Sequence, residues 1–315
     1  MLNKLKNKPI VINTDLDGMI SGLLLKKYLG CEIVGFSNSA EKIWLQTDFS
    51  DFKNVCFVDM FVANPDIICI DQHIISVDKK HHQILKNNPN KINPNLLNSR
   101  FFLPDNSYYY KYPFGTVHFI IALLEKKGFD LSGINLLKKL HNITLIDLIL
   151  RADDTMKTTI DSEYVNNATQ WWNWLLNLSN NGKIILKLKE YLNNISVTSS
   201  KNIKNNISEV LKNRPFFCDS SDGGIMQPIK NKLLKDNVKT YFKFIAEIMA
   251  IEIEMTNTTY KTYKGYTKRL SLTKEFRNEL TEFNTIKNKK IFSYAFVRSS
   301  KRDYNFSATF YQKND

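Results

Sequence analysis

Short apolar runs rich in Val and Ile recur in the first 75 residues and alternate with a segment of helical character. Runs of this kind are typical of strands that are buried on both faces, as in a parallel sheet. Strands that alternate with helices indicate βαβ units. The pattern therefore predicts a helix over about 19–28 and strands at 10–14, 32–36, 55–58 and 67–70.

The rest of the chain is less regular. Residues 86–113 are rich in Asn, Pro and Tyr, which favours a long irregular connection. Helices are expected over about 115–127 and 135–150. Trp171, Trp174, Leu175 and Leu178 share one face of a further helical pattern, which is typical of a core or a subunit interface, with stacking of nucleobases as the less favoured interpretation. An amphipathic helix around 240–254 and a strand pair at 292–297 and 306–311 follow.

A chain of 315 residues is long for one domain, so two domains are expected. The segment 196–214 is dominated by Ser, Asn and Lys and ends before a proline, as linkers commonly do. We therefore predict an α/β fold with a doubly wound, mainly parallel sheet in residues 1–195. A linker at 196–214 would join it to a second, smaller α+β domain at 215–315.

Acidic residues follow three of the predicted strands. Asp15 and Asp17 come after the first, Asp59 after the third, and the run Asp71-Gln72-His73 after the fourth. In open α/β sheets, ligands bind just beyond the carboxyl ends of such strands. Carboxylates gathered there would repel one another unless a cation joined them. The sequence therefore predicts a site for one or two divalent cations, a chemistry suited to phosphate hydrolysis.

These motifs resemble those of the DHH phosphoesterase superfamily, which includes single-strand exonucleases, oligoribonucleases and cyclic-dinucleotide phosphodiesterases. The resemblance covers roughly residues 8–160. The matching segments are Thr14–Gly22 for the first motif, Val58-Asp59 for the second, Asp71-Gln72-His73 for the third and Ala152-Asp153-Asp154-Thr155 for the fourth.

The resemblance implies a role for each of these side chains. Asp15 and Asp59 would hold one cation, Mn²⁺ or Mg²⁺, and Asp17, Asp59 and Asp154 a second, with Asp153 as the alternative to Asp154. In the catalytic pair, His73 would contact the substrate phosphate and Asp71 would orient the loop at the end of the strand.

Two positions depart from the family pattern. Asn13 and Gln72 stand where the family usually has metal-binding histidines. Amide oxygens suit hard cations but bind transition metals less well than imidazole does. Magnesium could then be preferred, or catalysis could be lost. His81 and His82 are expected on a polar surface turn, with replacement of the missing ligands as the less favoured interpretation.

Positive charge is concentrated in the second half of the chain. Residues 1–154 carry 18 Lys and Arg against 16 Asp and Glu, whereas residues 155–315 carry 26 against 15. This half could attract a polyanion, or its lysines could be ordinary surface residues. Arg298, Lys301 and Arg302 are candidate phosphate-binding residues, and a charged hairpin turn is the alternative interpretation.

The sequence thus predicts a cytoplasmic, metal-dependent phosphodiesterase that hydrolyses short single-stranded oligonucleotides or nucleotides. The alternative is a catalytically degenerate relative that binds nucleotide, nucleic acid or a protein partner without hydrolysis. No apolar run reaches the roughly 18–20 residues that cross a bilayer, so no membrane partner is expected. The four scattered cysteines indicate reduced core thiols, and the aromatic helix is compatible with a homodimer.

Overall fold

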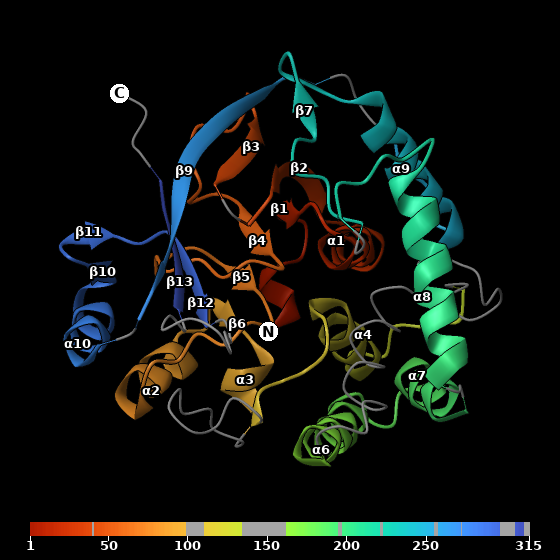
Figure 1. The fold of residues 1–315 in the computed structure, drawn as a ribbon, viewed down its shortest axis with the longest axis horizontal. Coiled ribbons are helices and arrows are strands. Elements are labelled where there is room, and N and C mark those ends of the chain that lie inside the picture. Colours follow the sequence, from red (N-terminus) through yellow and green to blue (C-terminus); the bar gives the residue numbers. More distant parts are fainter. Residues whose placement is uncertain are drawn as a thin grey trace.

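The computed structural model describes residues 1–39, 41–98, 110–133, 162–194, 197–220, 223–254, 258–271, 273–296 and 306–311. It confirms the α/β class, with one large mixed sheet and two small hairpins in this part of the chain (Figure 1). The strand order of the large sheet is β12-β13-β9-β3-β2-β1-β4-β5-β6. No helix among the described residues is both long and apolar enough to span a membrane.

The first half of the sheet is parallel, as predicted. Strands β2, β1, β4, β5 and β6 pair in parallel in that order. Their bounds are Pro9–Asn13 for β1, Glu32–Ser37 for β2, Cys56–Val58 for β4, Cys69–Ile70 for β5 and Lys91–Ile92 for β6. Every residue of β4 and β5 is buried, which explains their uninterrupted apolar sequence.

The second half of the sheet is antiparallel and is built mostly from the C-terminal part of the chain. Strand β3 (Lys42–Gln46) pairs with β9 (Tyr260–Leu270), then β13 (Phe306–Tyr311) and β12 (Ser293–Phe296) follow. Strands expected in the second domain therefore continue the sheet of the first, while the division of the chain into domains stays a prediction. The two hairpins are β7 (Ile229–Lys230) with β8 (Leu233–Leu234) and β10 (Thr285–Ile286) with β11 (Lys289–Lys290).

Helix α8 (Val197–Lys212) lies in the segment predicted as a linker, and it buries Ile207 and Leu211. The segment predicted as an irregular connection contains β6 and the short helix α3. The remaining bounds are Leu2–Lys4 for the 3₁₀ helix η1, Leu16–Leu29 for α1, Lys79–Asn87 for α2, Pro94–Leu97 for α3, Thr116–Lys126 for α4, Ser162–Leu178 for α6, Lys183–Asn194 for α7, Asp236–Ile248 for α9 and Lys274–Phe283 for α10.

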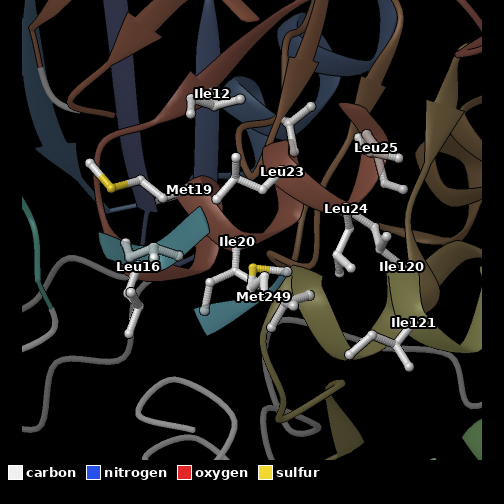
Figure 2. Close-up of a cluster of buried hydrophobic side chains, with 14 of the residues drawn as sticks. Ile12, Leu16, Met19, Ile20, Leu23, Leu24, Leu25, Ile120, Ile121 and Met249 are labelled. Carbon is white, nitrogen blue, oxygen red and sulfur yellow. The ribbon is translucent and has the colours of Figure 1, made fainter. Parts of the chain in front are cut away.

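Helix α1 lies at the centre of the larger of two apolar cores. Figure 2 shows its side chains between Ile12 of β1, Ile120 and Ile121 of α4, and Met249, which directly follows α9. The predicted face of α6 packs into the same core, where Trp171 and Leu175 are fully buried, so the prediction of a core position is confirmed; Trp172, outside that face, is fully buried as well. This burial fixes the position of the N-terminus of α1 at the carboxyl edge of the sheet.

The second core covers the opposite face and joins the C-terminal strands to the loops after β4 and β5. Ala63 N donates to Phe292 O at 2.7 Å, and Phe296 N donates to Ile74 O at 3.0 Å. The rings of Phe57 and Phe292 meet edge to face with centroids 5.6 Å apart. Strand β12 and Phe292, the residue before it, therefore restrain both loops that leave the carboxyl ends of these strands.

His81 is buried beside this second core, where it contacts Tyr294, so the prediction of a surface position is wrong. It lies on α2 with 2% of its surface exposed. Its Nδ1 accepts from Val77 N at 3.3 Å, so Nε2 carries the proton and donates to the Tyr294 hydroxyl at 3.2 Å. Burial lowers the pKa of His81 to about 4. The ring therefore connects α2 to β12 in its neutral form.

Lowering the pH should reduce the free energy of unfolding, because the buried His81 ring resists protonation in the folded protein. The unfolded chain binds a proton at His81 near pH 6.5, whereas the folded chain does so only near pH 4. The contribution to stability is complete above pH 6.5 and falls by about 1.4 kcal/mol for each pH unit down to 4. Denaturant unfolding of the wild type and of His81→Gln between pH 7.5 and 4 should show the steeper decline in the wild type. Equal slopes would contradict this assignment.

Candidate metal centre

Asp15 begins helix α1 as its N-cap, and its Oδ1 accepts from Gly18 N at 2.9 Å. Asp side chains are favoured at this position because they satisfy an N–H at the start of a helix. A Cβ at Gly18 would lie 2.4 Å from Asn13 O, so only glycine lets the helix start this close to the end of β1. The Asp-Leu-Asp-Gly sequence thus has a local structural reason and also brings carboxylates to the edge of the sheet.

Asn13, at the end of β1, links two of the carboxylates. Its Nδ2 donates to Asp15 Oδ2 at 2.8 Å and to Asp59 Oδ2 at 3.1 Å, while its Oδ1 accepts from Thr14 N. The side chain is 7% exposed. A neutral amide therefore lies between two acidic groups that come from different strands.

Asp59 follows β4 and carries the strongest electrostatic constraint of the site. It is 2% exposed and has a left-handed backbone with φ 59°, a conformation that costs energy and is concentrated at functional sites. The hydroxyl of Thr116 donates to its Oδ1 at 2.7 Å and favours the charged form. Burial is the main cause that raises the pKa of Asp59 well above its ordinary value, and further causes are the charges of Asp17, Asp15 and Asp71.

Asp17 is buried at 3% exposure and binds the start of helix α4. Its two oxygens accept from Thr116 N and Val117 N, each at 2.7 Å. Backbone N–H groups at a helix N-terminus favour a negative charge. Asp17 therefore positions α4, and with it the Thr116 hydroxyl that contacts Asp59.

Asp71 and His73 form a pair at the end of β5. Asp71 Oδ1 accepts from His73 Nδ1 at 2.7 Å, and Asp71 Oδ2 accepts from His73 N at 3.0 Å. Asp71 is 1% exposed, whereas the His73 side chain is 40% exposed and reaches solvent. With its proton on Nδ1, neutral His73 carries a lone pair on Nε2, which lies 3.4 Å from Gln72 Nε2.

Two asparagines beyond β6 support this loop. Asn93 Nδ2 donates to His73 O at 2.8 Å, and Asn95 Nδ2 donates to Gln72 O at 2.8 Å. Both side chains are buried, so these bonds hold the backbone of the Asp71–His73 run from the adjacent element. Neither residue was singled out from the sequence, because the pairing joins positions that are about twenty residues apart.

Within the described part of the chain, Asp59, Asp71 and His73 are the group whose arrangement fits a metal ion. Each offers one ligand atom, and these atoms lie within 4.8 Å of one another. Two carboxylate oxygens and an imidazole nitrogen suit Mn²⁺ and are acceptable to Mg²⁺. Asp15 and Asp17 come to the same edge of the sheet, where hydrogen bonds to Asn13 and to α4 engage them.

Five of the predicted residues lie outside the described residues. They are Asp153, Asp154, Arg298, Lys301 and Arg302. Their predicted roles as a metal ligand and as substrate-binding groups therefore remain predictions.

A glycine-containing segment also approaches this edge, which the sequence did not indicate. Ile225 N donates to Thr14 O at 3.2 Å, directly before Asp15, and Asn38 Nδ2 donates to Met226 O at 3.4 Å. Gly223, two residues earlier, has φ +78°. The segment 223–226 therefore lies against the ends of β1 and β2, beside the carboxylates.

No family model, no curated protein and no solved structure matches the chain. Its function is therefore argued from the geometry of this site and from the motifs in the sequence.

Replacing the buried carboxylate at position 59 should stabilise the metal-free protein. The pKa of Asp59 is higher in the folded protein than in the unfolded chain, where it is about 4. The folded protein therefore loses stability relative to the unfolded chain as the pH rises from about 4 to the folded pKa. In EDTA, Asp59→Asn should therefore unfold at higher denaturant concentration than the wild type. The gap should grow by about 1.4 kcal/mol for each pH unit within that window.

The matched control is Asp66→Asn, which removes an exposed carboxylate of the following loop. It should change the denaturation midpoint little at any pH. If Asp59→Asn proved less stable than the wild type at every pH, the hydrogen bonds of the carboxylate would outweigh its burial and charge repulsion at this position.

Position 223 should tolerate no side chain. At Gly223 a Cβ would lie 2.3 Å from the Tyr241 hydroxyl, and the positive φ adds strain for any L-residue. Gly223→Ala should destabilise the protein by roughly 1–3 kcal/mol in denaturant unfolding. Gly133→Ala is the control, since a Cβ at Gly133 meets nothing within 4 Å. Equal stabilities of the two variants would refute the close contact.

Proposed function

We propose that this chain is a metal-dependent phosphoesterase with a DHH-type fold that hydrolyses phosphodiester bonds in short single-stranded oligonucleotides or nucleotides. The observation that carries the proposal is the convergence of acidic groups from β1, β4 and β5 at one edge of the parallel sheet, with His73 beside them. The order and spacing of the DHH-like motifs support it.

The residues at this edge have complementary tasks. Asp59, Asp71 and His73 would supply the ligand atoms for a cation. Without one, the Asp71 carboxylate holds the imidazole in one orientation. When bound, a divalent cation polarises the phosphoryl group and lowers the pKa of a water that attacks it. The exposed side of His73 faces solvent, where a substrate phosphate can approach. The resemblance implies Asp15, Asp17 and Asp154 as further ligands, whereas the Asn13 amide and the N–H groups at the start of α4 already donate to Asp15 and Asp17.

The second half of the chain is proposed to bind the substrate. Strand β12 ends at Phe296. The Phe296 N–H donates to the carbonyl oxygen of Ile74, the residue that follows His73 in the chain. Arg298 follows Phe296 by two residues, a distance of at most about 7 Å along the chain. This contact and the basic composition of residues 155–315 support a role for Arg298, Lys301 and Arg302 in binding phosphate.

The alternative proposal is a relative that binds nucleotide, nucleic acid or a protein partner without catalysis. Asn13 and Gln72 favour it, because both direct amide nitrogens at groups that a catalytic metal site would use. Asn13 contacts Asp15 and Asp59, and Gln72 Nε2 lies 3.4 Å from His73 Nε2. Donors in these places compete with a cation.

Hydrolysis of a labelled oligoribonucleotide of a few nucleotides tests whether the chain is an enzyme. The purified chain should cleave it with Mn²⁺ or Mg²⁺ and not in EDTA. Mutation of groups that only orient metal ligands typically lowers metal affinity or activity by about 10–100-fold. Loss of the ligand itself in Asp59→Asn should therefore lower kcat/KM by more than about a hundredfold. Circular dichroism should show that this variant is folded.

Asp66→Asn should retain full activity in the same assay. Absence of turnover with both metals, together with oligonucleotide affinity that Asp59→Asn leaves unchanged, would support the binding protein and reject the enzyme.

A further inference from the structure

The Asn13 side chain has only one orientation that satisfies its neighbours. Its Nδ2 donates to Asp15 and Asp59, and its Oδ1 accepts from Thr14 N at 2.9 Å. In the reverse orientation, the amide oxygen would face two carboxylates, and the amide NH₂ would face the Thr14 N–H. Both contacts would be repulsive, and at 7% exposure little water can relieve them.

The amide hydrogens therefore occupy the space in which a cation would bridge Asp15 and Asp59. A bridging cation would bind the lone pairs of the carboxylate oxygens. The NH₂ group already donates hydrogen bonds to the same lone pairs, so the two compete. A cation could enter only if the amide turned over and lost its bond to Thr14 N. The residues present thus do not fit a cation at this position in the observed arrangement.

The other side of Asp59 is different. Its Oδ1 accepts from the Thr116 hydroxyl, a group that can share the oxygen with a cation because each carboxylate oxygen has two lone pairs. Asp71 and His73 each offer an atom within 4.8 Å of one carboxylate oxygen of Asp59. One cation therefore has a suitable set of ligands, whereas a second beside Asp15 does not.

We propose that the Asn13 amide replaces one cation, so that the chain binds a single divalent cation at Asp59, Asp71 and His73. This inference rests on the proposed function, because it assumes that the edge of the sheet is a metal site. It makes Asn13 the residue that determines how many cations bind. Removing its amide hydrogens should open the second position.

Two substitutions test this. Asn13→Asp keeps the shape of the side chain and replaces the NH₂ group by an oxygen ligand, and Asn13→His supplies an imidazole. Asn177→His, on the exposed face of α6, is the control for an added histidine. Thermal unfolding in EDTA checks that each variant folds, and Asn13→Asp should unfold at a lower temperature there because a third carboxylate joins Asp15 and Asp59.

The measurement is Mn²⁺ bound per chain by equilibrium dialysis, with electron paramagnetic resonance of the bound ion. The wild type and Asn177→His should bind one Mn²⁺ with the six-line spectrum of an isolated ion. At least one Asn13 variant should bind two, with the broadened spectrum of neighbouring spins, and Mn²⁺ should raise the unfolding temperature of Asn13→Asp more than that of the wild type.

The possible outcomes distinguish the role of Asn13 from the existence of the metal site. Two coupled Mn²⁺ ions in the wild type, or one ion in both folded Asn13 variants, would overturn the role of Asn13 and leave the metal site intact. No bound Mn²⁺ in any of the proteins would overturn the metal site, and with it the proposed function.

Discussion

The carboxylates of Asp17, Asp59 and Asp71 are each almost fully buried at one edge of the sheet, and their repulsion has to be balanced within the protein. Hydrogen-bond donors provide part of that balance, from the N-terminus of α4, from the Thr116 hydroxyl and from the Asn13 amide. Donors of this kind lower the cost of burying charge without removing it. The raised pKa of Asp59 reflects the cost of burial and the charge repulsion that these donors leave uncompensated. The positive charge of a bound cation would offset that cost.

The architecture brings these groups together from both ends of the chain. Strands β1, β4 and β5 are adjacent and parallel, so the residues that follow them meet at one edge. Helices α1 and α4 begin there, and the burial of α1 within the larger core fixes its first turn (Figure 2). From the other side, Phe292 and strand β12, which follows it, are hydrogen-bonded to the loops after β4 and β5. Changes in the C-terminal strands can therefore alter the geometry of the site.

The parallel strands and the acidic groups at their ends could be predicted from the sequence, because burial on both faces leaves a local apolar pattern and the acids interrupt it. Thr116 and Asn95 could not, since their partners lie at distant positions in the chain and hydroxyl and amide side chains are common in loops. His81 was misassigned because the polar residues around it belong to the exposed face of α2, while its own partner, Tyr294, comes from β12. Pairings across such separations follow from topology, which no local pattern encodes.

Crystals of the full chain soaked in Mn²⁺, with anomalous diffraction recorded on both sides of the manganese absorption edge, would test the metal site most directly. We expect one strong anomalous peak within coordination distance, about 2.0–2.4 Å, of Asp59, Asp71 and His73. The peak should be absent in Asp59→Asn. Manganese bound only at surface sites, with these three side chains unchanged, would contradict a metal centre at this edge of the sheet.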